Sequence, residues 1–386
     1  TLSMIGLEVE SVHNPAEKLK DFLIAQIIQA EPHPQADRLQ ICQVDIGQKI
    51  IQVVCGAPNA RVGLKSIFAP EGACIPAHNL ILKKTQIRGV ESCGMLCSAA
   101  ELTLEEEAQG IMELPPEAPV GELYARYAGL DDPIFDVAVT PNRGDCYSVY
   151  GIARDLAAAG LGNLKPLSFP TVESVFQGHL SLKIDAHATK ACPVFMGRII
   201  QNVQNKPSPQ WLQHRLKASG LRPKSVLVDI TNYIQFTYGR PMHAFDLDKI
   251  QGDLTVRLAR KGEKLKALNG EEYTLDEGMA VIADDAAVLS LAGIIGGEAS
   301  SCQEETTSIF LESALFDPQS IATTGRKCHI FTDSRARFER GVDPALVRSC
   351  LEFATQFILE HCGGKASEIL SVGSIDASHP RISFYP

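Results

Sequence analysis

The sequence lacks the features that would assign it to several common protein classes. Aromatic residues make up only 6% of its 386 residues, and there is a single tryptophan. No apolar run reaches the roughly 18 residues that a bilayer crossing needs, and no secretory signal opens the chain. There is no GxGxxG motif and no strict alternation of strand and helix, which argues against a dinucleotide-binding fold. The sequence therefore predicts a globular cytoplasmic protein with about two or three domains.

Motifs for metal binding and for covalent catalysis are also missing. The 11 cysteines are scattered, and their odd number indicates reduced thiols rather than a disulfide framework. Cys93 and Cys97 lie four positions apart, but no second pair of ligands accompanies them, so no metal site is predicted. No Ser-His-Asp or Cys-His set is recognisable, which disfavours a cysteine-dependent hydrolase.

The sequence also has fewer positively charged residues, 36 Lys and Arg, than negatively charged ones, 46 Asp and Glu. The net charge of −10 argues against non-specific nucleic-acid binding by the whole surface. Two local basic patches remain as candidates, formed by Lys83, Lys84 and Arg88, and by Arg326, Lys327, Arg335, Arg337 and Arg340.

Short β-branched runs, punctuated by Pro, Gly and Asn, fill residues 23–115. Several short strands within roughly 100 residues predict a small closed barrel. The predicted strands are residues 22–30, 39–47, 49–56 and 64–70.

The rest of the chain predicts a mixed α+β fold. The segment TPNRGDC at 140–146 is expected to open a helix that ends near Gly160. Further on, the pattern predicts strands at 180–185, 194–203 and 307–316, a hairpin across Asp284–Asp285, and helices at 209–218, 225–237 and 344–362.

Four separate segments indicate one pocket assembled from distant parts of the chain. They are RPMHAFD (240–246), LAGIIGG (291–297), FLESALF (310–316) and FTDSRARFERGVDP (331–344). Pro241 stiffens the backbone before His243. Glu312 lies within an apolar strand, where burying a charge is costly unless it is paired. From the pattern alone, Glu312 could be an edge-facing glutamate or one paired with an arginine, and His243 could be a packed, hydrogen-bonded residue.

Several motifs carry a resemblance to a known family. HPQADRL (33–39), VCGAPN (54–59) and IRGVESCGMLCSAAEL (87–102) resemble the tRNA-binding oligonucleotide-fold module. Together with VTPNRGDCYSVYGIARDLAA (139–158) and the four pocket segments, they resemble the N-terminal half of the bacterial phenylalanyl-tRNA synthetase beta subunit. The resemblance covers nearly the whole chain, and the motifs occur in the family's order.

The resemblance implies an α+β multidomain architecture. An oligonucleotide-fold barrel (23–115) interrupts an N-terminal α/β domain formed by residues 1–22 and 116–186. A larger mixed α+β editing domain (187–375) follows, and residues 376–386 are expected to link to a missing C-terminal half.

The resemblance also implies an editing site that hydrolyses tRNA charged by mistake with tyrosine, using a positioned water. It assigns Glu312 to the tyrosine hydroxyl, because a carboxylate accepts a phenolic O–H and phenylalanine would leave it unpaired. It assigns catalytic positions to His243, Asn232 and Thr332, with His243 holding water or the terminal ribose. Further substrate-binding residues are Ala292, Gly293, Ser334 and Arg240.

Three details of this assignment are specific to the chain. Ser334 stands where the family usually has alanine, so a hydroxyl is added to the pocket. Arg240 and Arg326 are candidates for binding the phosphates of the terminal adenosine. Gly296 and Gly297 are expected to serve a tight turn rather than the pocket.

The family's beta subunit forms a hetero-tetramer of two alpha and two beta subunits, and it acts on tRNA(Phe). The resemblance places aminoacylation, with its ATP and Mg²⁺, outside this chain, which is expected to hold no cofactor. An alternative stays open, in which the chain is a tRNA-binding and assembly scaffold without activity of its own.

Overall fold

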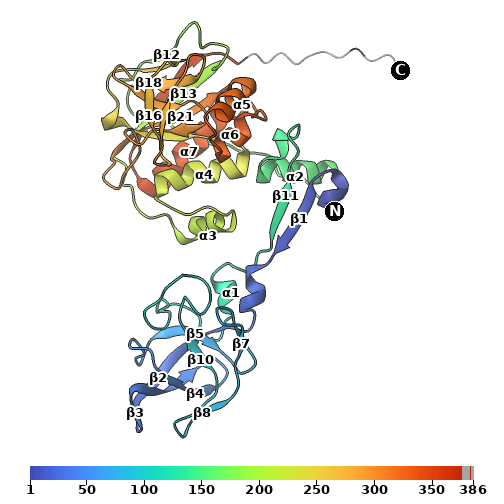
Figure 1. Ribbon diagram of the computed structural model, residues 1–386, viewed down its shortest axis with the longest axis vertical. Coiled ribbons are helices and arrows are strands. Elements are labelled where there is room, and N and C mark those ends of the chain that lie inside the picture. Colours follow the sequence, from blue (N-terminus) through green and yellow to red (C-terminus); the bar gives the residue numbers. More distant parts are fainter. Residues whose placement is uncertain (376–382, 384–386) are drawn as a thin grey trace. The chain divides into compact units, whose positions relative to one another are not determined.

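A computed structural model describes residues 1–375 and Ser383 (Figure 1). The chain forms two compact units, one of Glu10–Asp136 and one of Thr1–Val9 with Val137–Pro386. The predicted linker at 376–386 lies outside the described residues, apart from Ser383. None of the helices in the described residues combines the length and apolar character of a membrane span.

The smaller unit is built around a five-stranded antiparallel sheet. Its strands, in spatial order, are β10 (Met95–Cys97), β5 (Lys65–Ala69), β2 (Leu23–His33), β3 (Ala36–Asp45) and β4 (Ile50–Cys55). The outer strands β4 and β10 also contact each other, so the sheet curls into a barrel as predicted. Two hairpins complete it: β6 (Cys74–Ile75) with β7 (Leu80–Ile81), and β8 (Thr85–Ile87) with β9 (Val90–Ser92).

The barrel unit extends beyond the range predicted for it. Leu19, the last residue of the short 3₁₀ helix η2 (Pro15–Leu19), and Phe22 just after it are buried in one of the unit's two apolar clusters. Ala118, Tyr124 and Ala125, around the helix α1 (Tyr124–Tyr127), are buried in the same cluster. The observed barrel unit therefore includes residues that were predicted to belong to the discontinuous domain of 1–22 and 116–186, because the side chains of these flanking residues complete the barrel core.

The larger unit contains two sheets. The four-stranded antiparallel sheet has the order β14 (His243–Asp246), β21 (Ser308–Leu315), β13 (Val194–Gln201) and β22 (Lys365–Gly373). The five-stranded sheet has the order β12 (Leu182–Ile184), β15 (Leu254–Leu258), β18 (Ala280–Ala283), β19 (Val288–Leu291) and β20 (Ile295–Gly296). The predicted hairpin across Asp284–Asp285 is the β18–β19 pair.

The four-stranded sheet lies between a helical layer and the second sheet (Figure 1). Along β21, Ile309 and Leu311 pack on the helical side, while Phe310 and Ala314 pack toward the second sheet. This alternation follows from the two-residue period of a strand. The helical layer consists of α3 (Gln210–Ala218), α4 (Val226–Tyr238) and α7 (Leu346–Cys362). Glu312 shares its face of β21 with Phe310 and Ala314, and so faces the second sheet.

The remaining elements are short. The helix α2 (Val149–Ala158) starts later than predicted, because TPNRGDC forms a turn and the 3₁₀ helix η3 (Gly144–Cys146). Ser148 caps α2, and its hydroxyl accepts a hydrogen bond from Gly151 N–H at 3.0 Å. The others are η1 (Leu2–Ile5), β1 (Glu8–His13) paired with β11 (Ile134–Ala138), η4 (Leu247–Lys249), β16 (Lys264–Lys266) paired with β17 (Glu272–Thr274), α5 (Pro318–Lys327) and α6 (Asp333–Phe338).

Candidate functional site

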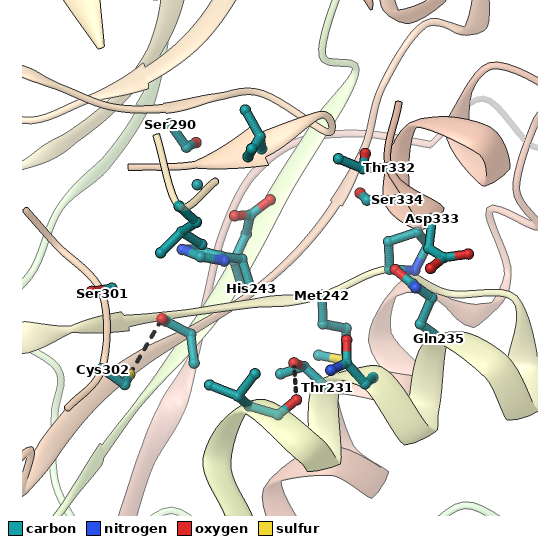
Figure 2. Close-up of a pocket in the computed structure, with 18 of the residues that line it drawn as sticks. Thr231, Gln235, Met242, His243, Ser290, Ser301, Cys302, Thr332, Asp333 and Ser334 are labelled. Atoms are coloured by element: carbon teal, nitrogen blue, oxygen red, sulfur yellow. Dashed lines mark hydrogen bonds between the residues drawn. The ribbon is translucent and has the colours of Figure 1, made fainter. Parts of the chain in front are cut away.

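A cavity of about 630 Å³ opens beside the edge strand β14 in the larger unit (Figure 2). Its walls come from α4 and the residues before it, from β14, from the turn between β19 and β20, from the loop after β20, and from the start of α6. In Figure 2, Ser301 and Cys302 lie at one end, Thr332 and Ser334 lie at the other, and His243 lies between them.

Glu312 and His243 form the centre of the cavity. They are directly opposite each other in the antiparallel pairing of β21 with β14, so their side chains leave the same face of the sheet, with Cα atoms about 4.5–5.5 Å apart. Only 6% of the surface of Glu312 is exposed. In the described part of the chain, its carboxyl group has no hydrogen bond and no ion pair, and burial is the only influence on its pKa. A buried, unpaired carboxyl group therefore faces an open cavity.

Burial moves both groups toward their neutral forms. It raises the pKa of Glu312 to about 8 and lowers the pKa of His243 to about 4. Removal of water disfavours the charged form of each, so at neutral pH the pair is a carboxylic acid and a neutral imidazole. Glu312 can then donate a hydrogen bond as well as accept one, which differs from the ionised carboxylate expected from the sequence.

The imidazole of His243 is held from two sides. It packs edge-on against Phe245, with ring centroids 4.4 Å apart. Gly296 covers it from the second sheet, where a Cβ atom would lie 2.5 Å from Cε1 of His243. Nε2 of His243 is buried and has no hydrogen-bond partner among the described residues. The ring is therefore fixed in place, and its buried Nε2 is left without a hydrogen-bond partner in the described chain.

The far wall is joined to the turn after β19 by two side-chain hydroxyls. Thr332 donates to the carbonyl of Ile294 at 2.8 Å and caps α6 by accepting from Arg335 N–H at 3.1 Å. Ser334 donates to the carbonyl of Gly293 at 3.0 Å. Both hydroxyl protons are committed to the backbone, so these residues shape the cavity and offer only oxygen lone pairs to a ligand.

Comparison with known proteins shows which families the chain resembles. Residues 191–363 match the family model described as "B3/4 domain", and residues 22–123 match the one described as "Putative tRNA binding domain". Proteins named "Phenylalanine--tRNA ligase beta subunit" align with the whole chain. The one from Zymomonas mobilis is 51% identical over 387 residues, and the one from Novosphingobium aromaticivorans is 52% identical over 386 residues.

The chain belongs to the phenylalanine–tRNA ligase beta subunits. It spans about half the length of these relatives, covering 49% and 48% of them. A solved N-terminal fragment of the phenylalanyl-tRNA synthetase beta-subunit from Pyrococcus horikoshii is a remote structural neighbour, with a TM-score of 0.37 and 18% identity over 62% of this chain and 67% of that one. That likeness is too low to support any inference about the site.

Most of the site residues predicted from this beta-subunit resemblance meet at the cavity. Those that line it are His243, Asn232, Thr332, Glu312, Gly293 and Ser334. Asn232 is half-buried on α4. Gly293 has a φ of 68°, and a Cβ there would lie 2.7 Å from the ring of Phe316, so this position requires glycine for both conformation and space. Their roles in the reaction remain predictions.

The structure places two of the predicted substrate contacts outside the cavity lining. Arg240 is only 1% exposed and does not line the cavity, because its guanidinium donates to the backbone carbonyls of Ala314 and Asp343. Its role is to join elements inside the fold, and it is not available to a phosphate. Ala292 is buried in the core between the sheets rather than in the cavity wall. Arg326, the second phosphate candidate, is exposed on α5 and also does not line the cavity.

Other lining residues were not singled out by the sequence. Gly296 was assigned to a turn, yet it covers His243. Gln235, Ser290, Cys302 and Asn205 also line the cavity, and they are ordinary polar or small residues within helix, strand and loop patterns. No spacing signal in the sequence distinguishes them from surface or core positions.

One further cluster has the composition of a metal site. Asp145, Cys146 and Asp155 bring ligand-type atoms within 4.8 Å of one another. Arg143 donates to Asp145 at 3.0 Å and to Asp155 at 2.9 Å, so its guanidinium already supplies the positive charge that would otherwise come from an ion. The network fastens η3 to α2.

Proposed function

We propose that this cavity is an editing site that hydrolyses the ester of tyrosyl-tRNA(Phe). The observation that carries the proposal is the buried carboxyl group of Glu312, which has no partner in the described chain and faces an open cavity beside His243. A buried polar group without a partner is costly, and a ligand that supplies the partner recovers that cost. The phenol of tyrosine is such a ligand, because it donates and accepts hydrogen bonds.

Selection against phenylalanine follows from the same group. Phenylalanine would fill the space but would leave Glu312 unpaired, at a cost of roughly 1–3 kcal/mol. That cost corresponds to a preference for tyrosine of about five- to 150-fold. A synthetic site built for phenylalanine rejects an added hydroxyl only modestly, so a second site with the opposite preference supplies the missing discrimination.

Hydrolysis at this site would rely on positioning. The oxygen of a water attacks the ester carbonyl carbon, the bond to the ribose oxygen breaks, and the proton released by the water ends on that oxygen, giving tyrosine and a free ribose hydroxyl. His243 lines the cavity and is suited to orienting the water, while its pKa of about 4 makes it a weak base. An aminoacyl ester is already activated, so holding water and ester in a reactive geometry supplies much of the acceleration.

The test measures ester loss from tyrosyl-tRNA(Phe) and from phenylalanyl-tRNA(Phe) with the purified chain. We expect faster loss of the tyrosyl ester, loss of that preference in Glu312→Ala, and a lower rate in His243→Ala. Full preference for tyrosine in Glu312→Ala would refute the assignment of the phenol contact.

The alternative function, a tRNA-binding and assembly scaffold, is supported by the match of residues 22–123 to a tRNA-binding module. Hydrolysis no faster than buffer by the wild-type chain would leave only this function. The barrel offers few stacking groups to RNA, since its phenylalanines Phe22 and Phe68 are buried.

The names of the relatives also suggest partners. We infer that the chain acts with an alpha subunit and with tRNA(Phe), and that ATP and Mg²⁺ serve the alpha subunit's activation of phenylalanine. The chain alone should then catalyse no exchange of pyrophosphate into ATP. This exchange should require the alpha subunit together with the full-length beta subunit.

A further inference from the structure

The barrel unit contains a cavity of its own, of about 830 Å³, which the proposed editing function does not use. Its walls come from the end of β4 and the loop after it, from β7 and the residues that follow it, from β8, from β10 and from the loop before Ile111. Its size suits a site that takes up a ligand. The side chains that line it are mostly apolar, namely Val54, Leu80, Ile81, Leu82, Ile87, Met95, Leu96 and Ile111.

Two of these apolar side chains, both on β7, are exposed. Leu80 is 54% exposed and Ile81 is 59% exposed. In the described chain β7 pairs only with β6, so its other edge has no strand partner. Burial of apolar side chains against a partner is favourable, and an open strand edge can pair with an extended peptide. This wall of the cavity therefore offers both kinds of contact that a bound peptide strand makes.

The charge around the cavity is negative. The barrel unit, Glu10–Asp136, contains 18 Asp and Glu but only 10 Lys and Arg, so it carries most of the chain's net charge of −10. Glu101 lines the cavity, where its carboxylate accepts from the N–H and the Oγ of Ser98, both at 2.7 Å, and it has no ion pair within the described residues. The loop that brings Ala108 to the wall also carries three exposed glutamates, at 105–107.

The basic patch predicted at Lys83, Lys84 and Arg88 does not balance this charge. Lys84 is paired with Glu91 at 2.9 Å, and Arg88 donates to the carbonyl of Gln35 at 2.8 Å. Among the described residues, Lys83 is the single basic residue that lines the cavity, and no aromatic residue lines it. RNA needs positive charge against its phosphates and surfaces on which its bases stack, and this cavity supplies little of either.

We propose that this cavity binds an extended segment of a partner polypeptide in which aliphatic side chains are flanked by lysine or arginine. The aliphatic side chains fill the cavity against Leu80 and Ile81, and the backbone of the segment pairs with the open edge of β7. A basic side chain lies beside Glu101. Charge complementarity favours such a segment and disfavours a phosphate backbone. The binding is separate from the proposed editing function, because the cavity lies within the barrel unit alone.

The test selects a ligand from a random library and then measures its affinity. A phage library of random dodecapeptides is selected on the immobilised full chain and, in parallel, on the double variant Leu80→Ser/Ile81→Ser. Peptides enriched on the wild-type chain are synthesised with fluorescein, and Kd is measured by anisotropy. Val62→Ser is the matched control, since Val62 is 61% exposed in the same unit and does not line the cavity. Glu101→Gln is compared with Glu71→Gln, at an exposed position outside the cavity.

We expect the peptides enriched on the wild-type chain to contain aliphatic residues and to carry a net positive charge. They should bind the double variant about tenfold more weakly or worse, because two apolar side chains are lost from the interface. Glu101→Gln should weaken binding about threefold at low salt and by less at high salt, as for an exposed ion pair. Both controls should bind as the wild type does, and circular dichroism should show that every variant is folded.

Three results would overturn the proposal. The first is a selection that enriches no peptide whose affinity depends on Leu80 and Ile81. The second is a net negative charge on the enriched peptides. The third is displacement of the peptide by a single-stranded RNA of the same length whose own affinity falls in the double variant, because the cavity would then be an RNA site. None of these measurements uses ester hydrolysis, so failure of this proposal and failure of the proposed editing function are distinguishable.

Discussion

The protonation of Glu312 predicts a distinctive dependence of stability on pH. Its pKa is raised to about 8 in the folded chain from a usual value of 4.5. The folded state therefore holds a proton that the unfolded state releases above pH 4.5. The stabilisation is fully present below pH 4.5 and is lost as pH rises through 8. Glu312→Gln, which is neutral at every pH, should not show this loss.

The expected magnitude can be worked out for a window above neutral pH. Where the folded state binds one proton more than the unfolded state, the free energy of unfolding changes by about 1.4 kcal/mol per pH unit. This slope decreases as the pH approaches the pKa of Glu312 in the folded state. Between pH 6.5 and 9, the wild-type chain should therefore lose about 2 kcal/mol relative to Glu312→Gln. The titration of His243 does not affect the difference between the wild-type chain and Glu312→Gln. Its lowered pKa of about 4 gives a stabilisation that is lost as pH falls below 6.5, and both proteins share it.

Urea unfolding followed by tryptophan fluorescence is the suitable assay. Trp211 is the only tryptophan, and it stacks on Phe357 between α3 and α7, so it reports on the larger unit alone. Glu305→Gln, at an exposed position before β21, is the matched control and should follow the wild type at every pH. If the wild type and Glu312→Gln keep a constant difference from pH 6.5 to 9, Glu312 does not hold a proton and the account of its burial is wrong.

Three further changes test other parts of the site and its support. Gly296→Ala should reduce ester hydrolysis about a hundredfold, with urea stability measured alongside, because the added methyl group would displace the ring of His243 from its position. Glu352→Gln should lower the free energy of unfolding in urea by about 3–5 kcal/mol, because it leaves the buried guanidinium of Arg198, now 2.8 Å from that carboxylate, without its counter-charge. Ser334→Ala should cost about 1 kcal/mol in the same assay through loss of one hydrogen bond to the backbone, and should leave hydrolysis of the tyrosyl ester within a fewfold of wild type.

Much of the fold follows from local patterns in the sequence. The run SIFLESAL has the alternation that β21 uses to separate the helical layer from the second sheet, and its predicted bounds differ from the observed ones by one residue at each end. The strand β22 was not predicted. Its partner β13 lies more than 150 residues earlier, and the two-residue alternation of a strand does not indicate which distant strand it pairs with. The domain boundaries differ for a similar reason. Nothing local shows that Leu19 and Tyr124 are buried in the barrel core.

The site was predictable only in part. The segments that carry His243, Glu312 and Ser334 contain unusual residues in apolar surroundings, and they do meet in one cavity. Gly296 and Asn205 could not be found in this way, because a glycine in a turn and an asparagine in a loop are common. Their place in the cavity wall depends on what approaches them from elsewhere in the chain, namely the imidazole of His243 and the loop carbonyl to which Asn205 donates.

A charged residue within an apolar run does not by itself identify a binding site. Arg198, Arg240 and Glu312 all satisfy that description, and all three are buried. Arg198 is paired with Glu352 and also donates to the carbonyls of Ser367 and Val172. Arg240 donates to two backbone carbonyls, although its Nε has no partner in the described chain. Glu312 alone of the three has no partner in the described chain, and burial then forces it to hold a proton. What separates a binding residue from a structural one here is therefore the absence of an internal partner, which only the three-dimensional arrangement reveals.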